Sequence, residues 1–362
     1  MIDRYKELNH QKVLVTGASG FIGQALVNAL ADAGAQVTAL SRTRFSPVGQ
    51  GRANVRTVTG SLNNAADLPE ILRGQDMVFH LAYDVRAPAG DNLSAFENLY
   101  SSAVKSGVKR FIHASSIVVY DGWPDQDINE NSPVSRPGGS PYRQAKIDME
   151  RRLMDGPLPV AILQPTIVYG PGSTQWTDAL ASNIATGGIV LPTPVGVCNG
   201  VFVDDVVQAF LLAGQLPDLE RERFIISGPS TFSWSGLLEG YASIVGGGSV
   251  TYRPLKELTE RIGPKPDKSS ANDAPSAMAR ISAVGRRMLG RERFEKLVRL
   301  ARQLLTKSGP TYPGHHFLEE VSSTGTCQID QARDRLGYRP EFDLDKGLAA
   351  TAPHLRNLLG KR

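Results

Sequence analysis

The stretch Val13-Leu14-Val15-Thr16-Gly17-Ala18-Ser19-Gly20-Phe21-Ile22-Gly23 decides how the rest of the chain is interpreted. Its apolar start is typical of a buried strand, and it breaks into three glycines spaced three residues apart before apolar residues recur at helical spacing. Glycine accepts a positive φ and lets another group approach the backbone, because it has no Cβ. The unpaired N–H groups at the start of a helix attract anions. The stretch therefore predicts a strand, a tight turn and a helix N-terminus that bind a pyrophosphate.

Length and composition exclude several classes of protein. With 362 residues, 41% hydrophobic and 21% charged, the chain can bury a large core and form two lobes. The first residues are polar and no run approaches the ~18 apolar residues of a membrane span, so we expect a cytoplasmic protein. Two cysteines and the pair His315-His316 do not make a metal site, and no metal is expected. The net charge of +4 stems from one basic segment, so nucleic acid is not an expected partner.

Short apolar segments alternate with helical patterns along most of the chain. The strand-like segments are 13–16, 36–41, 55–59, 77–82, 110–115 and 159–163. This alternation predicts an α/β fold, a doubly wound parallel sheet of the Rossmann type with helices on both faces. Residues 171–199 and those beyond 228 are richer in glycine and proline. We assign 1–170 plus 203–228 to a dinucleotide-binding domain, and 171–202 plus 229–362 to a smaller, mixed substrate-binding lobe.

A tyrosine and a lysine four residues apart mark the expected reaction site. Tyr142 and Lys146 follow Pro141 in a helical pattern, and their spacing places both on one face. A free tyrosine titrates near pH ~10, but a nearby ammonium favours the phenolate, so we expect Lys146 to lower the pKa of Tyr142. The hydroxyls of Ser115 and Ser116 follow an apolar strand, at the end where parallel sheets bind ligands. Taken alone, the tyrosine–lysine pair would also fit an ordinary surface helix.

Together the motifs resemble an extended short-chain dehydrogenase/reductase of the NAD-dependent epimerase/dehydratase type, over nearly the whole chain. The resemblance extends over the glycine motif 16–23, the strand motif 76–82, Asn92 and Asn98, Tyr142 and Lys146, and segments 164–172, 203–206 and 332–340. It implies that Tyr142 is the general acid/base, that Lys146 holds the nicotinamide ribose, and that Ser116 orients the substrate. The implied cofactor-binding residues are Gly17, Ser19, Gly20, Phe21, Ile22, Gly23, Arg42, Leu62, Leu81, Ala82, Tyr142, Lys146, Pro165, Ile167 and Val168. A homodimer formed through helical faces is common in the family.

The choice of cofactor depends on the end of the second strand. In this fold, an acid about 20 residues beyond the glycines accepts the ribose hydroxyls of NAD, whereas an arginine accommodates the phosphate of NADP. Here Ser41 and Arg42 stand at that point, and Ser61 stands where many family members have an aspartate. The sequence favours NADP over NAD, with the alternative that Arg42 is a solvated surface residue.

Departures from the family pattern bear on the substrate. Gln164 replaces a frequent arginine, Ile167 replaces an asparagine, and residues 192–203 contain no lysine or arginine. A buried diphosphate without a nearby cation would be poorly compensated. We therefore favour an oxidoreductase that transfers hydride between the nicotinamide and a small-molecule alcohol or ketone. The alternative is a nucleotide-sugar epimerase or dehydratase with tightly bound NAD, and a third class is a non-catalytic dinucleotide-binding regulator.

A basic insertion occupies residues 253–314 and is longer than the family usually carries. Residues 253–307 contain 14 Lys/Arg against 6 Asp/Glu. Within it, 286–307 show an apolar stripe bordered by basic side chains, as in an amphipathic helix. We interpret this helix as packed on the second lobe. A lid over the substrate cleft and contact with an anionic membrane surface are the alternatives.

Overall fold

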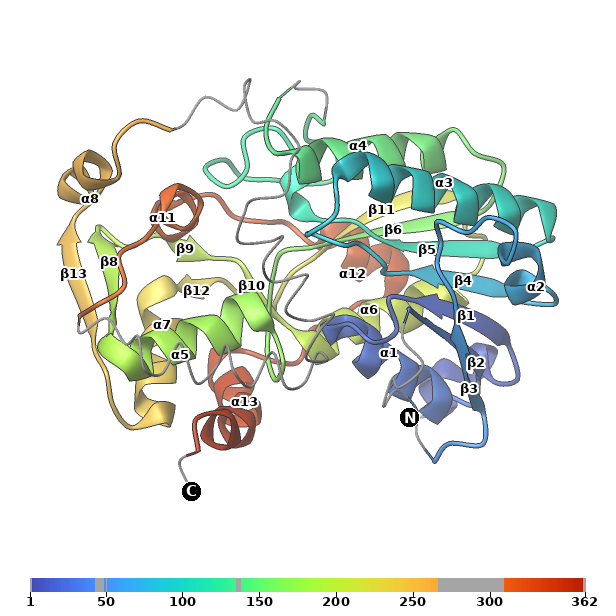
Figure 1. Cartoon of the computed structure of the whole chain (residues 1–362), viewed down its shortest axis with the longest axis horizontal. Helices are drawn as coiled ribbons and strands as arrows, with labels where there is room; N and C mark the ends of the chain where they lie inside the picture. The colour runs from blue at the N-terminus through green and yellow to red at the C-terminus, as the bar shows by residue number, and fades with distance from the viewer. Residues whose placement is uncertain (1, 43–48, 50, 135–137, 266–308, 361–362) are drawn as a thin grey trace, which may run out of the picture.

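The computed structural model describes residues 2–42, 49, 51–134, 138–265 and 309–360. A seven-stranded parallel sheet in the order β11-β6-β5-β4-β1-β2-β3 forms the centre of the larger lobe (Figure 1). Its strands are β1 (Lys12–Thr16), β2 (Gln36–Ser41), β3 (Val55–Thr59), β4 (Met77–His80), β5 (Arg110–Ala114), β6 (Val160–Pro165) and β11 (Arg221–Ile226). The strand order reverses between β1 and β4, and sheets of this kind bind ligands at the carboxyl ends beside such a point. The predicted doubly wound parallel sheet is confirmed.

Helices cover both faces of this sheet, which explains why its central strands are apolar throughout. All residues of β4 and β6 are buried, as in parallel sheets covered on both sides. One face carries α1 (Phe21–Asp32) and α6 (Val203–Gln215), and the other carries α2 (Leu68–Leu72), α3 (Ala89–Lys105) and α4 (Pro141–Met154) (Figure 1). The short helices η1 (Ile2–Leu8) and η2 (Ile117–Val119) complete this part of the larger lobe.

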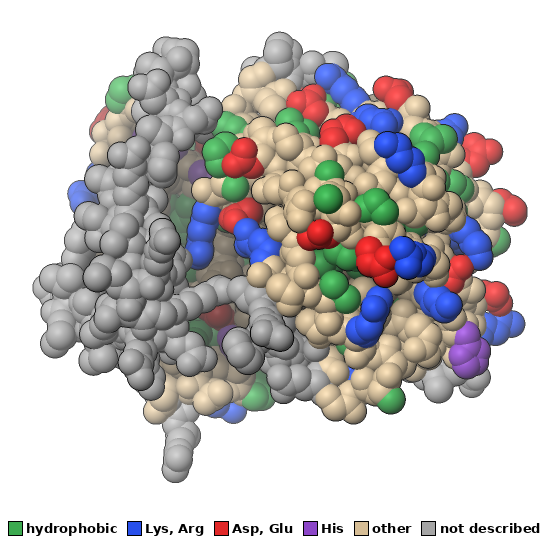
Figure 2. Space-filling model, turned by 45° about the vertical axis from the view of Figure 1, so that its right-hand side comes forward, with side chains coloured by type: hydrophobic (Ala, Val, Ile, Leu, Met, Phe, Trp, Pro, Cys, Tyr) green, Lys and Arg blue, Asp and Glu red, His purple; other side chains and the backbone are tan. Residues whose placement is uncertain are grey.

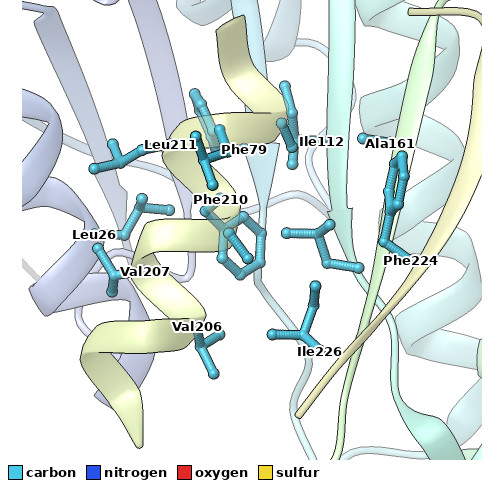
Figure 3. Close-up of a cluster of buried hydrophobic side chains, with 14 of the residues drawn as sticks. Leu26, Phe79, Ile112, Ala161, Val206, Val207, Phe210, Leu211, Phe224 and Ile226 are labelled. Atoms are coloured by element: carbon cyan, nitrogen blue, oxygen red, sulfur yellow. The ribbon is translucent and has the colours of Figure 1, made fainter. Parts of the chain in front are cut away.

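The core beneath α6 fixes that helix on the sheet. Figure 3 shows Phe210 of α6 among side chains of the sheet and of α1, including Ile112, Phe224 and Leu26. These four side chains are fully buried, and Phe210 lies 6.5 Å from Phe79 between ring centroids. Removing a buried phenylalanine side chain costs about 3–5 kcal/mol of stability, so the position of α6 is strongly determined.

The smaller lobe has its own core and three two-stranded ladders. Its strands are β7 (Ile167–Tyr169), β8 (Ile189–Thr193), β9 (Val197–Cys198), β10 (Gly200–Phe202), β12 (Phe232–Ser233) and β13 (Val250–Pro254), paired as β10-β7, β12-β9 and β13-β8. Its helices are η3 (Thr174–Asp178), α5 (Ala179–Gly187), α7 (Trp234–Val245), α8 (Leu255–Ile262), α11 (His315–Ser322) and α13 (Leu344–Leu358). Trp234 and Tyr241 of α7 are almost fully buried at its centre.

One C-terminal segment packs elsewhere than the sequence suggests. The helix α12 (Asp330–Leu336) and Tyr338 were expected in the smaller lobe, but they pack against β11 and α6 of the larger lobe. Ala332, Leu336 and Tyr338 are buried there, and the Tyr338 hydroxyl donates to the carbonyl of Ser227 at 2.9 Å. The segment therefore covers the edge strand β11, because its apolar side chains find a partner surface there.

The surface of the described residues carries mixed charge. Figure 2 shows Lys and Arg side chains interspersed with Asp and Glu on the visible face of the larger lobe. None of the helices among the described residues is both long enough and apolar enough to cross a membrane.

Candidate active site

Glycine allows the turn after β1 to pack tightly between β4 and α1. Gly17 has a φ of +69°, and a Cβ at this position would lie 2.8 Å from the backbone nitrogen of Ala82. A Cβ on Gly23 would overlap the carbonyl oxygen of Gly17. The amide of Gly20 donates to that carbonyl at 2.9 Å and closes the turn. A side chain at Gly17 or Gly23 would therefore displace α1 from the sheet.

The N-terminus of α1 is suited to an anion. Gly20 is the N-cap residue; among the described residues no side chain caps the helix, and its first turn contains no acidic residue. Ser19 and Gly20 are exposed, whereas Phe21 and Ile22 are half-buried. The first N–H groups of a helix carry partial positive charge and need partners. The turn and the helix start therefore fit the pyrophosphate of a dinucleotide.

A cavity of about 360 Å³ lies beside this turn, within the size range of small-molecule sites. The predicted cofactor residues that line it are Gly17, Ser19, Gly20, Arg42, Leu62, Leu81 and Ala82. The lining residues that sequence reasoning did not assign to the cofactor are Leu40, Ser41, Ser61, Asn63, His80, Tyr83, Asp84, Ala87, Asp91, Asn92 and Ala95. Most of them lie just at or beyond the ends of β2, β3 and β4. The rule that parallel sheets bind ligands at carboxyl ends could have found them.

Arg42 pairs with a carboxylate that the sequence did not point to. Its Nη1 lies 2.6 Å from Oδ2 of Asp84, so the ion pair connects the ends of β2 and β4 on either side of β1. Partial burial raises the pKa of Asp84, but hydrogen bonds from Arg42 and from the Arg86 amide outweigh this, and the net pKa lies below its usual value. Asn92 holds the backbone of Asp84 by two hydrogen bonds. Its Oδ1 accepts from the Asp84 amide at 2.8 Å, and its Nδ2 donates to the Asp84 carbonyl at 3.0 Å. Arg42, which was expected to face the ribose phosphate of NADP, thus faces the carboxylate of Asp84.

The helix α4 brings the predicted tyrosine and serine together. Ser140 caps this helix by accepting from the Arg143 amide at 3.1 Å, and Pro141 occupies its first turn. Tyr142 is half-buried, and its hydroxyl shares a hydrogen bond with the side chain of Ser116. Its ring meets the ring of Tyr83 edge-on, with centroids 4.9 Å apart. Residues from the ends of β4 and β5 and from α4 therefore converge on one phenol.

The pKa of Tyr142 shifts opposite to the sequence expectation. Burial raises it to about 12, although the hydrogen bond with Ser116 opposes the shift. The expected lowering by Lys146 is not found, because its Nζ lies 5.9 Å from the centre of the Tyr142 ring and donates to the carbonyl of Ala114 at 2.6 Å. Burial also lowers the pKa of Lys146 to about 8, with Glu150 acting against it. The site as described therefore holds a neutral phenol beside a lysine that titrates near pH 8.

The two serines after β5 have different partners. Ser115 is buried and donates to the carboxylate of Glu150. Ser116 caps η2 by accepting from the Val118 amide at 3.4 Å, and its side chain is hydrogen-bonded to that of Tyr142. This geometry supports Ser116 as the substrate-orienting hydroxyl, a role that stays a prediction.

The sequence comparison decides the family. The family model described as "NAD dependent epimerase/dehydratase family" matches residues 13–227, more than half of the chain. The chain belongs to the NAD dependent epimerase/dehydratase family. This confirms the resemblance drawn from the motifs, and it identifies the protein as a member of a family of NAD(P)-dependent enzymes.

Relatives of this family member include reductases. The chain is 24% identical to "2-alkyl-3-oxoalkanoate reductase" of Stenotrophomonas maltophilia, over 93% of this chain and 97% of the relative. It is 28% identical to "Putative dihydroflavonol 4-reductase" of Synechocystis sp., over 66% and 76% of the two chains. A solved structure of the epimerase Mth375 from Methanothermobacter thermautotrophicus has a TM-score of 0.72, covers 98% of this chain and 95% of that one, and is 18% identical. The last likeness concerns the fold alone.

Several residues predicted to bind the cofactor do not line the cavity. Pro165 ends β6, and Ile167 and Val168 belong to β7, whereas the cavity lies beside β1, β2 and β4. Pro165 and Ile167 are buried and Val168 is half-buried. Tyr83 connects the cavity to the predicted catalytic pair of Tyr142 and Lys146, because it lines the cavity and its ring lies 5.0 Å from Nζ of Lys146.

The basic helix predicted over 286–307 lies outside the described residues. The described ends of the insertion contain α8, and Lys265 forms an ion pair with Glu319 of α11. Nε2 of His315 lies 3.1 Å from the carbonyl oxygen of Gly263. Among the described residues, no group of three or more His, Cys, Asp and Glu is placed to hold a metal. The interpretations of 286–307 as a packed helix, a lid or a membrane contact stay predictions.

Proposed function

We propose that this protein is an NADP(H)-dependent oxidoreductase that transfers hydride between the nicotinamide and the reacting carbon of a small-molecule alcohol or ketone. The observation that carries the proposal is that Ser116 is hydrogen-bonded to Tyr142, while Tyr142 and Lys146 both lie against the ring of Tyr83, which itself lines the cavity beside the glycine turn. A hydroxyl, a phenol and an ammonium group next to a dinucleotide site supply the proton chemistry of carbonyl reduction.

In the direction of reduction, the chemistry that a bound nicotinamide would supply is hydride for the carbonyl carbon. The phenol of Tyr142 donates the proton to the carbonyl oxygen, which the hydroxyl of Ser116 orients. A pKa of about 12 keeps this phenol protonated at neutral pH, so Tyr142 is in the form that donates a proton. Lys146 would hold the nicotinamide ribose, and the glycine turn with the start of α1 would hold the pyrophosphate.

The positions that depart from the family pattern support a ketone or alcohol without a diphosphate rather than a nucleotide sugar. The amide of Gln164 is fully engaged, since it donates to Glu150 at 2.9 Å and accepts from the Tyr120 hydroxyl at 2.7 Å. Ile167 is 5% exposed and packs in the apolar core of the smaller lobe. The Stenotrophomonas relative is named for the reduction of a 3-oxo compound, which supports the same class.

A preference for NADP(H) over NAD(H) is supported by the end of β2. The Arg42 side chain is 73% exposed at the cavity; Ser41 stands where NAD users have an acid, and Ser61 stands where many family members have an aspartate. The carboxylate of Asp84 competes with a ribose phosphate for Arg42, so the preference is expected to be moderate. An ion pair this exposed contributes at most about 1 kcal/mol, which a phosphate can replace.

The alternative function is a nucleotide-sugar epimerase or dehydratase that keeps NAD bound through each cycle. It is supported by membership of the NAD dependent epimerase/dehydratase family and uses the same tyrosine. A non-catalytic dinucleotide-binding regulator is the third class, and the intact trio of Ser116, Tyr142 and Lys146 argues against it.

One experiment separates these functions. Purified protein is denatured and released nicotinamide cofactor is quantified, and native protein is supplied with NADPH or NADH and a panel of ketones, steroids and nucleotide sugars. The proposal predicts little retained cofactor and NADPH consumption with a ketone. Stoichiometric NAD with conversion of a nucleotide sugar and no net oxidation would establish the epimerase class, and binding without any conversion would establish the regulator.

We also propose a cytoplasmic location. Both cysteines among the described residues, Cys198 and Cys327, are thiols rather than a disulfide, as is usual in reducing compartments. Fractionation of cells that express the tagged chain would test this, and recovery from an oxidising compartment would contradict it.

A further inference from the structure

A buried carboxylate lies one helical turn beyond Lys146. Glu150 of α4 is 2% exposed, and three side chains donate hydrogen bonds to it. Nε2 of Gln164 lies 2.9 and 3.2 Å from its two oxygens, Nε of Arg223 lies 2.8 Å away, and the hydroxyl of Ser115 donates as well. Burial of a carboxylate is costly unless donors surround it. The fold therefore maintains a complete set of partners for a side chain that the proposed chemistry does not itself use.

These partners connect the catalytic helix to the turn that carries Ser116. They come from the end of β5, from β6 and from β11, which are neighbours in the sheet. Ser115 directly precedes Ser116, and Gln164 accepts from the hydroxyl of Tyr120, which follows η2. The segment 115–120, which contains Ser116, is therefore connected to Glu150 at both ends. Ser115 donates to Glu150 directly, and Tyr120 is connected to it through the side-chain amide of Gln164.

Glu150 also stands four residues beyond Lys146 on α4, at the i, i+4 spacing that brings helical side chains together, whereas Asp148, which is closer in sequence, is exposed. Lys146 is 4% exposed, so a nearby opposite charge matters more than it would in water. The titratable and charged groups that face Lys146 or Glu150 from the packed elements are His80, His113, Tyr83, Tyr120, Tyr142 and Arg223. Burial lowers the pKa of both histidines, and they carry no charge at neutral pH.

We propose that Glu150 is a positioning residue for the proposed reaction, whose carboxylate fixes the Ser116 turn against α4 and keeps Lys146 protonated. The inference rests on the proposed function, because it assigns to Glu150 the arrangement of the residues that carry out that reaction. It assigns the hydrogen bonds from Ser115, Gln164 and Arg223 to Glu150 a role in the reaction as well as in packing.

The test is the substitution Glu150→Gln, which keeps the shape of the side chain and removes its charge. Lys146 titrates near pH 8, and loss of an adjacent carboxylate lowers a lysine pKa by about one unit or more. A shift of one unit reduces the protonated fraction about fivefold at pH 8 and hardly at pH 6. We expect kcat to fall about fivefold more at pH 8 than at pH 6. The Kd for NADPH, measured by fluorescence, is expected to weaken with the same pH dependence.

Two control variants separate charge from packing. Arg223→Gln removes a hydrogen-bond donor from the Glu150 carboxylate but leaves the charge of that carboxylate in place. The pH above which kcat declines is therefore expected to stay the same or to rise. Glu97→Gln removes a carboxylate from the exposed pair with Arg152 on the same side of the sheet, at 3.2 Å, and should change neither profile.

The outcomes decide between the two roles. Equal losses at pH 6 and pH 8 in Glu150→Gln would overturn the inference and leave a packing role. A downward shift in Arg223→Gln would also overturn it, and this result decides the matter even if Glu150→Gln does not fold. Because Kd for NADPH needs no turnover, the inference stays testable if no ketone is reduced, a result that would remove the proposed function alone.

Discussion

Replacing Tyr142 by phenylalanine removes one oxygen atom from the proposed site and little else. The ring of Tyr142 packs edge-on against Tyr83 at 4.9 Å, and phenylalanine keeps this contact. Among the described residues, the side-chain hydrogen-bond partner that Tyr142 loses is Ser116. A neutral hydrogen bond contributes about 1 kcal/mol net, so the variant should fold with nearly unchanged stability and bind NADPH normally.

The same substitution should nearly abolish turnover. Proton transfer by a positioned side chain contributes roughly 10²–10⁴-fold, equivalent to about 3–5 kcal/mol of barrier. The assay is the steady-state oxidation of NADPH with the best ketone of the panel, alongside thermal unfolding and Kd for NADPH. The matched control is Tyr338→Phe, which removes a buried hydroxyl bonded to Ser227 at 2.9 Å in another part of the lobe. Tyr142→Phe with wild-type kcat would refute the role given to this phenol.

Three further outcomes are expected. Gly17→Ala forces a side chain to φ +69° with its Cβ 2.8 Å from the Ala82 nitrogen, so it should destabilise the fold by about 1–3 kcal/mol in urea titration and weaken NADPH binding; unchanged stability would argue against this turn. Arg42→Ala should weaken Kd for NADPH about tenfold and leave NADH unaffected, while Asp84→Asn should strengthen NADPH binding, and equal effects on both cofactors would argue against phosphate recognition. Since burial lowers the pKa of Lys146 to about 8 and its protonated form is the active one, kcat/KM should be full below that pH and decline above it; an increase through pH 8 would contradict this.

Local patterns in the sequence were sufficient for the family and the fold. The glycine turn of 13–23 requires a strand before it and a helix after it, and both are present as β1 and α1. Alternation of apolar strands and amphipathic helices predicted the parallel sheet, because each pattern reports which face of a segment is buried. Spacing of four residues placed Tyr142 and Lys146 on one face of α4, and their catalytic roles stay predictions.

What the sequence did not reveal depends on partners that are distant along the chain. The direction of the Tyr142 pKa shift depends on burial, which a spacing argument does not measure. The partner of Arg42 lies 42 residues away and becomes adjacent only through the strand order β4-β1-β2. In the sequence, Glu150 is one of several charged residues on a polar helix. Its burial follows from the packing of α4 on β5, β6 and β11, which the sequence pattern of the helix does not reveal.

The most direct test of the central claim is transfer of label from cofactor to substrate. NADPH deuterated at the reacting carbon of the nicotinamide is incubated with the protein and a ketone, and the product alcohol is examined by mass spectrometry. The account predicts one deuterium on the product carbon for each NADPH consumed, with the transfer lost in Tyr142→Phe. Product without deuterium, or conversion without consumption of NADPH, would contradict it.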